Sequence, residues 1–285
     1  NKSVIVAPKA KMDECDDLAL TKFNRRFEVL FYDDNEALQK IADDADCIYF
    51  IKYGKNDAFT PTGIRTLVHC VFDMTDQHGD VYAGVSGTLA KKFGKHDFVP
   101  HMISLQPSMT GENLRGELKI PEDAVVFGRH GGMDTFNLKF VMEAIILVVQ
   151  QRDNIWFVFV NTPKFVEHPH VVFLDKICDP EDKNKYICTC DAHLEASTLG
   201  HTFGLSMGEF SVNNKPIIAY NGPVWNTAHF DILGDRALYF KTPEELVKIF
   251  CLFDPAEYED RDMNCYKEYT AEKVMPQFKQ VFLDN

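Results

Sequence analysis

The sequence has 285 residues, of which 45% are hydrophobic and 26% are charged, values typical of a globular protein long enough for two domains. Its formal net charge of −13 argues against a nucleic-acid-binding surface and against electrostatic docking on an anionic membrane, because both need clusters of basic residues. All apolar runs fall short of the roughly 20 residues that span a bilayer, so we expect no stable membrane insertion. The eight cysteines lie mostly within apolar runs and lack metal-ligand spacing, which favours free thiols and a cytoplasmic location.

The first third of the chain alternates short apolar runs with polar stretches. The apolar runs predict five strands, at residues 4–7, 29–32, 47–51, 67–72 and 81–85. A helical pattern covers residues 35–45 with Asn35 as its expected N-cap, and Ser86 is expected to begin a helix that runs to residue 92. Residues 102–122 contain several prolines and glycines, so we interpret them as the hinge region between two domains.

The alternation is more regular after this hinge region. It predicts six further strands, at residues 125–127, 156–160, 171–174, 186–190, 217–220 and 237–240, and a helix over residues 135–150. Thr242, Pro243 and Glu245 predict the start of another helix, with a capping box. Residues 254–285 also have a helical pattern.

Near-continuous apolar strands that alternate with helices are typical of parallel sheets covered on both faces. The sequence therefore predicts an α/β protein with two Rossmann-like domains. We place the N-terminal domain at residues 1–118, the C-terminal domain at residues 119–262 and a C-terminal helical tail at residues 263–285.

A glycine-rich turn, Gly-Arg-His-Gly-Gly at residues 128–132, follows the first strand of the second predicted domain. Such a turn exposes backbone N–H groups that can bind a diphosphate, here those of Gly131 and Gly132. Arg129 adds a permanent positive charge beside it. The turn lacks the Gly-x-Gly-x-x-Gly spacing of dinucleotide-binding proteins, which disfavours a nucleotide-dependent oxidoreductase.

Residues 200–216 carry the most specific pattern in the chain. Small residues there lead into a short amphipathic helix and then into the apolar strand at residues 217–220. Thr202, Gly204 and the N–H groups at the start of the helix would suit a phosphate or a sugar hydroxyl. Glu209 is a lone acid among apolar residues, and such an acid either binds a ligand or faces solvent.

This segment resembles the donor-site signature of retaining glycosyltransferases of the GT-B fold, family 4 type. In that signature a Glu-x-Phe-Gly-Leu-x-x-x-Glu run precedes a Lys-Pro-Ile/Val strand, and the matching residues here are Phe203, Gly204, Leu205, Glu209, Lys215 and Pro216. The resemblance covers residues 120–250 and, more loosely, residues 67–103. It implies the GT-B architecture, in which the parallel sheets of two Rossmann-like domains face each other across a cleft. It also implies that residues 263–285 cross back onto the first domain.

The resemblance further implies roles for individual residues. Glu209 would accept hydrogen bonds from the ribose hydroxyls of a nucleotide, and Asn161 would lie where the family contacts the nucleotide. Arg129 would act on the leaving diphosphate. His69 would face the transferred sugar, with His78 as the second candidate, although a histidine in an apolar strand is also typical of a hydrogen-bonded core residue.

The chain departs from the family pattern at three positions. His201 replaces a glutamate that holds hydroxyls of the donor sugar, and Glu195 and Ser197 stand where related sequences often have His or Arg. These departures indicate either a changed sugar preference or lost catalysis. His201 could still hydrogen-bond a hydroxyl.

Asp44-Ala45-Asp46 resembles the metal-binding Asp-x-Asp of the other large glycosyltransferase fold. It precedes a predicted strand, whereas the metal-binding motif follows one, so we expect an exposed turn and no essential metal.

The sequence thus predicts a cytoplasmic, metal-independent glycosyltransferase that needs no other cofactor. It would move a sugar, with retention, from a UDP- or GDP-linked donor to a glycan or small-molecule acceptor. Two alternatives within the same fold remain open, a catalytically weak or inactive nucleotide-sugar-binding protein and a nucleotide-sugar epimerase or hydrolase.

Overall fold

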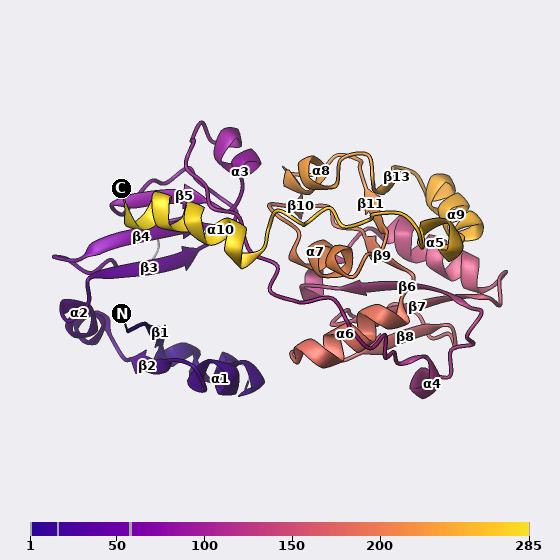
Figure 1. Ribbon diagram of the computed structural model, residues 1–285, viewed down its shortest axis with the longest axis horizontal. Coiled ribbons are helices and arrows are strands. Elements are labelled where there is room, and N and C mark those ends of the chain that lie inside the picture. The colour runs from indigo at the N-terminus through magenta and orange to yellow at the C-terminus, as the bar shows by residue number, and fades with distance from the viewer. Residues whose placement is uncertain (1, 16, 57–58, 285) are drawn as a thin grey trace. The chain divides into compact units, whose positions relative to one another are not determined.

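The computed structural model describes residues 2–15, 17–56 and 59–284 and divides into two compact units (Figure 1). Unit 1 contains Asn1–Val99 and Gln277–Asn285, and unit 2 contains Pro100–Pro276. The division at Val99 lies well before residue 118, because Ile103 and Leu105 of the expected hinge region are buried in the core of unit 2. Among the described residues, no helix is both long and apolar enough to cross a bilayer.

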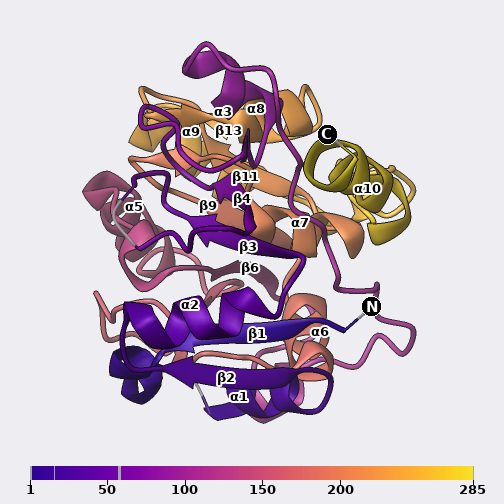
Figure 2. The ribbon, with the colours of Figure 1, turned by 90° about the vertical axis from the view of Figure 1, so that its left-hand side faces the viewer.

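Unit 1 contains two parallel sheets (Figure 2). One pairs β1 (Val4–Pro8) with β2 (Glu28–Tyr32), and the other has the order β3 (Cys47–Lys52), β4 (Arg65–Cys70) and β5 (Val81–Gly84). Its helical elements before residue 100 are η1 (Lys9–Glu14), α1 (Asp17–Asn24), α2 (Asn35–Asp43) and α3 (Gly87–Lys92). The five strands predicted for this region are therefore confirmed, with ends that differ by one or two residues.

The helix starts of unit 1 follow from local capping. Ser86 caps α3 as predicted, because its Oγ accepts a hydrogen bond from the N–H of Leu89 at 3.2 Å. The prediction of Asn35 as the N-cap of α2 is wrong by one residue. Asp34 is the N-cap, and its Oδ1 accepts a hydrogen bond from the N–H of Ala37 at 2.8 Å.

The C-terminal end of the chain belongs to the core of unit 1 (Figure 1). It is formed by the end of α10 (Ala271–Phe278) and by the π-helical η4 (Lys279–Leu283). The rings of Phe278 and Phe282 pack edge-on against Tyr49, with centroids 5.3 and 5.4 Å away. Arg65 Nη1 donates to the carbonyl oxygen of Leu283 at 3.0 Å. Residues far apart in the sequence thus complete one hydrophobic core.

Unit 2 is built on a six-stranded parallel sheet. Its strands are β6 (Val125–His130), β7 (Ile155–Val160), β8 (Val171–Leu174), β9 (Ala192–Glu195), β11 (Ile217–Tyr220) and β13 (Leu238–Phe240). Across the sheet their order is β13-β11-β9-β6-β7-β8, which is the strand order of a doubly wound Rossmann sheet. Strands are added toward one edge of the sheet from β6 to β8 and toward the other edge from β9 onward, so the strand order reverses between β6 and β9. Ligands of such sheets bind outside the carboxyl ends of the strands at this switch point.

Helices cover both faces of this sheet. They are α4 (Arg115–Leu118), α5 (Lys139–Val149), α6 (Pro180–Thr189), α7 (Leu205–Val212), α8 (Ala228–Leu233) and α9 (Pro243–Leu252), with the short helices η2 (Met133–Thr135) and η3 (Pro255–Tyr258). Two short strands, β10 (Gly200–His201) and β12 (Asn226–Thr227), pair in a separate parallel sheet. Alternate residues of β7 enter two separate cores, Trp156 on the side of α6 and α7 and Phe157 on the side of α5 and α9. All six residues of β7 are buried, as expected for a central parallel strand.

One predicted strand of unit 2 is wrong. Residues 186–190 form the end of α6 and its C-cap, and the fourth strand of the sheet is β9. A short apolar run does not distinguish a strand from the buried end of a helix. The local signal for the helix is Asp179-Pro180, in which Asp179 Oδ1 accepts a hydrogen bond from the N–H of Glu181 at 2.8 Å and Pro180 occupies the first turn.

Of two other predicted helix starts in unit 2, one is confirmed and one is wrong. The capping box of α9 is confirmed, because Thr242 Oγ1 accepts from the N–H of Glu245 and Glu245 Oε2 accepts from the N–H of Thr242, both at 3.3 Å. α5 begins at Lys139 and not at Thr135, because Thr135 closes the turn of η2.

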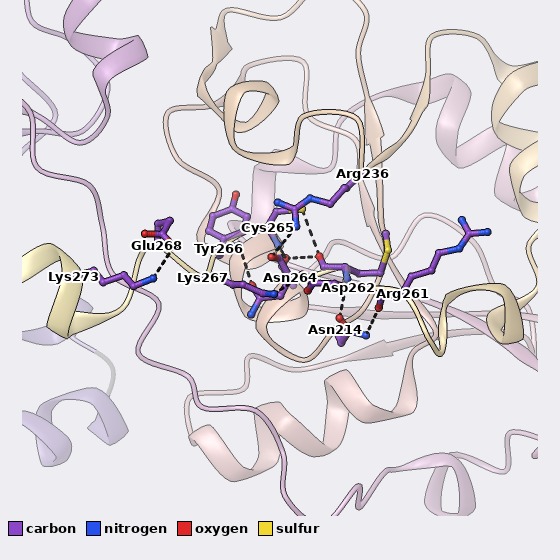
Figure 3. A network of polar contacts seen from close by, with 12 residues as sticks. Asn214, Arg236, Arg261, Asp262, Asn264, Cys265, Tyr266, Lys267, Glu268 and Lys273 are labelled. Carbon is purple, nitrogen blue, oxygen red and sulfur yellow. Dashed lines mark hydrogen bonds and ion pairs between the residues drawn. The ribbon is translucent and has the colours of Figure 1, made fainter.

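A polar network fastens the segment that follows α9 to unit 2 (Figure 3). Asn214 Nδ2 donates to the carbonyl oxygen of Arg261, and Asn214 Oδ1 accepts from the N–H of Met263, both at 2.9 Å. This brings Tyr266 into the core, where its hydroxyl donates to the carbonyl oxygen of Phe203 at 2.9 Å. The tail segment thereby supports the loop that leads into α7.

Candidate functional site

The switch point of unit 2 brings two chain segments to the same edge of the sheet. β6 and β9 are neighbours, and both run parallel, so the residues after His130 and after Glu195 lie at the same end. Most of the residues predicted for a site in the second domain belong to these segments or to the start of α7. The sheet order, which the sequence does not state, is what gathers them.

Arg129 organises the glycine-rich turn from inside. Its side chain is buried, and Nη2 donates to the carbonyl oxygen of Gly132 at 2.7 Å and to Thr135 Oγ1 at 2.5 Å. Nη1 donates to Thr162 Oγ1 at 2.6 Å and to the carbonyl oxygen of Asn161 at 3.3 Å. The guanidinium thus joins the loop after β6 to the loop after β7.

Asn161, in the loop after β7, also bonds to the loop after β6. It adopts a left-handed backbone conformation with φ 51°, and its Nδ2 donates to the carbonyl oxygen of Gly131 at 2.8 Å. Gly131 is half-buried and Gly132 is exposed, so the outer part of the turn is open to a ligand.

A cavity of about 160 Å³ lies beside this turn. It is lined by His130, Gly131, Val160, Asn161, Lys176, Ile177, Lys183 and Tyr186. The walls combine apolar side chains and an aromatic ring with two lysines. This local positive charge contrasts with the net charge of −13 of the whole chain. A cavity of this composition suits a flat, polar, anionic group such as a nucleotide.

Glu209 is part of an ion-pair cluster next to this cavity. Its side chain is 18% exposed, and its Oε1 lies 2.7 Å from Nζ of Lys183 on α6. Its Oε2 lies 3.2 Å from Nε2 of His130. Burial, with the nearby His193 and Lys183, holds the pKa of His130 well below its ordinary value, so this imidazole is neutral. Glu209 is therefore a partly buried, paired carboxylate and does not simply face solvent.

A second buried carboxylate, Glu195, lies at the end of β9. His201 Nε2 is 2.7 Å from its Oε1, and His193 Nε2 is 3.7 Å from its Oε2. Burial alone would raise the pKa of Glu195, but the adjacent imidazoles of His201 and His193 hold it well below its ordinary value. Glu195 is therefore an ionised side chain within the protein interior.

The loop between β10 and α7 has a fixed conformation. Gly204 precedes the first residue of α7 with φ 91°, a value that residues with a Cβ rarely adopt. Thr202 and Phe203 are buried, and Leu205, at the start of the helix, is 47% exposed. The bond from Tyr266 to Phe203 holds this loop in place.

The predicted site residues of the first domain belong to unit 1. His69 is buried on β4, and both of its ring nitrogens have partners, Tyr49 Oη at 2.6 Å from Nδ1 and the carbonyl oxygen of Val99 at 2.8 Å from Nε2. This is the geometry of a hydrogen-bonded core histidine. His78 is also engaged, since Nδ1 lies 2.6 Å from the carbonyl oxygen of Asp76 and Nε2 lies 3.1 Å from Lys52 Nζ.

Asp44 and Asp46 are exposed at the end of α2. Within the residues that the structure describes, no group of three or more His, Cys, Asp or Glu side chains is arranged to hold a metal ion.

Sequence reasoning missed Lys183 and Tyr186 as members of the cavity wall. Both were hidden by the wrong strand at residues 186–190, because only the helical assignment places Lys183 and Tyr186 on one face three residues apart. The Asp179-Pro180 helix start was the signal that could have revealed them.

Comparisons with sequence families and with curated proteins return no match. Solved structures do match. HepE of Anabaena, in complex with UDP and glucose, has a TM-score of 0.72 and 13% identity, over 95% of this chain and 90% of that chain. A glycosyltransferase from Rickettsia africae ESF-5 has a TM-score of 0.66 and 11% identity, over the full length of both chains. TarM of S. aureus has a TM-score of 0.64 and 12% identity, over 88% of this chain and 59% of that chain.

At these identities the likeness establishes the fold. The chain is an α/β protein with parallel sheets, and its structural neighbours are glycosyltransferases of the GT-B class. The predicted fold class is therefore confirmed.

Proposed function

We propose that this chain is a glycosyltransferase that binds a nucleotide-diphosphate sugar in unit 2 and transfers its sugar to a glycan or small-molecule acceptor. The observation that carries the proposal is the cavity beside the glycine-rich turn, where Lys176, Lys183 and Gly131 surround a space at the carboxyl ends of β6 and β7. We take the donor to be UDP-linked first and GDP-linked second, since the Anabaena neighbour was solved with UDP.

The chemistry of the transfer fits these residues. Breaking the bond between sugar and phosphate places negative charge on the leaving diphosphate, which preorganised N–H groups and cations stabilise. In this proposal the N–H groups of Gly131 and Gly132 and those before α7, at Thr202 to Leu205, face the diphosphate, and Arg129 holds the turn in shape. Glu209 would accept hydrogen bonds from the ribose hydroxyls.

We further propose that the transfer is of the retaining, family 4 type and needs no metal ion. Full activity after dialysis against EDTA would support metal independence, and loss that Mg²⁺ or Mn²⁺ restores would contradict it. The anomeric configuration of the product, read by NMR, decides between retention and inversion. His69 and His78 remain candidates for contact with the sugar, but each would have to exchange a present hydrogen-bond partner for it.

A thermal-shift panel of UDP, GDP, TDP and ADP, each with and without an attached sugar, tests the proposal. A ligand present at 100 times its dissociation constant adds about 2.7 kcal/mol to the free energy of unfolding, which is easily seen as a raised melting temperature. A clear shift with one family of nucleotides would name the donor and justify an acceptor screen by mass spectrometry. Product formed without acceptor would indicate a hydrolase or epimerase, and no shift with any nucleotide would overturn the proposal.

Lys183 and Lys185 form a matched pair of variants on α6. Lys183 lines the cavity, whereas Lys185 lies outside it and pairs with Glu112 at 3.2 Å. We expect Lys183→Ala to weaken nucleotide binding about tenfold, because it removes a partly buried positive charge. Lys185→Ala should leave the dissociation constant within twofold. Isothermal titration calorimetry with UDP measures both, and equal effects would place the nucleotide elsewhere.

A further inference from the structure

A second cavity, of about 340 Å³, belongs to unit 1 and is lined by α3 (labelled in Figure 1) and by the segment that follows this helix. Its volume lies within the roughly 300–1,000 Å³ of pockets that hold small-molecule ligands. Two lysines, a histidine, an aromatic ring and two glycines line it, and all of them come from one short stretch of the chain: Gly87, Lys91, Gly94, Lys95, His96 and Phe98.

The basic side chains of this cavity are not neutralised by acids. Lys95 Nζ donates to the uncharged amide oxygen of Gln77 at 2.6 Å. Within the residues that the structure describes, the side chains of Lys91 and His96 have no hydrogen-bond or ion-pair partner. Asp97, the next acid in the sequence, is exposed and does not line the cavity. In a chain with a net charge of −13, the cavity is therefore a local site of positive charge.

Stabilisation of α3 explains only part of this pattern. Lys91 lies in the last turn of the helix, where a positive charge complements the unpaired carbonyl groups. Lys95 and His96 lie beyond the end of the helix, so the helix does not require them. Elsewhere in unit 1 an exposed lysine has an acidic partner, as Lys9 has Asp33 at 3.0 Å.

Backbone contacts hold both walls of the cavity in place. On the helix side the chain turns at Gly94, whose φ is 66°, and the N–H of Lys95 bonds back to the carbonyl oxygen of Ala90 at 2.8 Å. On the other side, Phe98 forms a parallel bridge with Gly84 at the end of β5. A cavity with fixed walls binds a ligand at a lower entropic cost than one that must first be ordered.

The lining residues indicate the chemistry of the ligand. Two ammonium groups and an imidazole around one space match the double charge and the three acceptor oxygens of a phosphate monoester better than they match a single carboxylate. The ring of Phe98 offers an apolar surface to the organic part of such an ester. Gly94 leaves room for it, because even a Cβ at this position would meet nothing within 4 Å.

We propose that this cavity binds a small phosphate monoester, with Lys91, Lys95 and His96 on the phosphate and Phe98 against the organic part. The site lies in unit 1 and shares no residue with the cavity of unit 2. It therefore does not depend on the proposed function. Inorganic phosphate would use the same basic side chains, but it has no organic part to contact Phe98.

Mapping of ¹H–¹⁵N NMR shifts in the full chain locates the site, with glucose 6-phosphate, inorganic phosphate and glucose as probes. We expect glucose 6-phosphate to shift the backbone amides of Gly94, Lys95 and His96, and glucose at the same concentration to leave them unchanged. Shifts confined to unit 2, or equal shifts with glucose, would overturn the inference.

Lys91 and Lys92 provide a matched pair of variants, because they are neighbours on α3 with the same charge and only Lys91 lines the cavity. At low ionic strength we expect Lys91→Ala to weaken binding of glucose 6-phosphate about fivefold, and Lys92→Ala to weaken it less than about twofold. Replacing both Lys91 and Lys95 should weaken it more than about tenfold. The same NMR titrations measure these affinities, and an otherwise unchanged spectrum shows that a variant is folded. Equal effects of Lys91→Ala and Lys92→Ala would reflect the general charge of the helix and would overturn the site.

Phe98→Leu distinguishes an ester from inorganic phosphate, because it removes the ring but keeps an apolar side chain. We expect it to weaken binding of glucose 6-phosphate about threefold, since it removes the aromatic contact, and to leave binding of inorganic phosphate unchanged. In the wild type, inorganic phosphate should bind more weakly than the ester. Equal affinities for the two probes, with no effect of Phe98→Leu, would assign the cavity to inorganic phosphate and overturn the proposed ester.

Discussion

At the scale of single residues, Arg129 illustrates how a predicted catalytic residue can also be a structural one. Its four Nη hydrogen bonds join two loops in the interior of unit 2. We expect Arg129→Ala to lower the free energy of unfolding by about 3 kcal/mol or more, because hydrogen bonds to charged groups contribute about 1.5–3 kcal/mol each and buried partners are left unpaired. Urea denaturation measures the loss.

Two further arginine variants control this prediction. Arg129→Lys should recover little of the stability, because one ammonium group cannot reach both loops as a planar guanidinium does. Arg152→Ala, at an exposed position of the same unit, should change stability by less than about 0.5 kcal/mol. A small effect of Arg129→Ala on stability, together with a large loss of turnover, would show that its main role lies in the reaction.

Glu209 gives a prediction specific to the ribose. If its carboxylate accepts a hydrogen bond from the 2′-hydroxyl, the wild type should bind 2′-deoxy-UDP about tenfold more weakly than UDP, a difference of about 1.4 kcal/mol. Glu209→Ala should bind both nucleotides with similar, reduced affinity. Calorimetry on the four combinations measures the coupling. Equal discrimination by the variant and the wild type would assign the ribose to other residues.

At the scale of elements, the start of α7 depends on a glycine. A Cβ at Gly204 would lie 2.4 Å from Met207 Cε and 2.9 Å from Tyr266 Oη, in addition to the strain of φ 91°. We expect Gly204→Ala to lower the free energy of unfolding by more than 2 kcal/mol, the sum of about 1–2 kcal/mol of backbone strain and the disturbed contact with Tyr266.

Gly94 is the matched control for this prediction. It also has a positive φ, 66°, but a Cβ there would meet nothing within 4 Å. Gly94→Ala should therefore show the backbone strain alone. Thermal unfolding of the two variants separates the terms, and equal losses would mean that the contact with Tyr266 does not constrain the helix start.

At the scale of the whole molecule, buried neutral histidines make stability depend on pH. Burial lowers the pKa of His130, His193 and His229, whereas the unfolded chain titrates near pH 6.5. The unfolded state therefore binds more protons as pH falls below 6.5, and the folded state loses stability. For His229, with a pKa of about 4, the loss by pH 4 is on the order of 3 kcal/mol.

Glu195 contributes in the same direction at lower pH. Its folded pKa is depressed, so its stabilisation is present above the ordinary carboxylate range and is lost as pH falls through the folded value. Denaturant titrations between pH 4 and pH 8 should show stability declining steadily below pH 6.5. His229→Asn should reduce that decline. A stability that stays constant between pH 6.5 and pH 4 would contradict the burial of these imidazoles.

The sequence by itself determined the features that depend on neighbouring residues. Alternating apolar runs gave ten of the strands, with the misplaced run at residues 186–190 as the exception, and Ser86 and Thr242 marked helix starts through their own hydrogen bonds. Neighbouring residues are enough to predict these features, because a capping bond acts within one helical turn and an apolar run lies within one strand.

Only the tertiary structure decided the order of the strands and the partners of buried charges. The switch point between β6 and β9 exists because distant segments align in one sheet. Lys183 contacts Glu209 from a different helix, and His201 contacts Glu195 across a turn. Neither contact can be read from the order of residues in the sequence. His69 likewise became a hydrogen-bonded core histidine through Tyr49 and Val99, which lie 20 and 30 residues away in the chain. Pairing of charges and hydrogen bonds in the interior depends on distance in space, which sequence spacing does not specify.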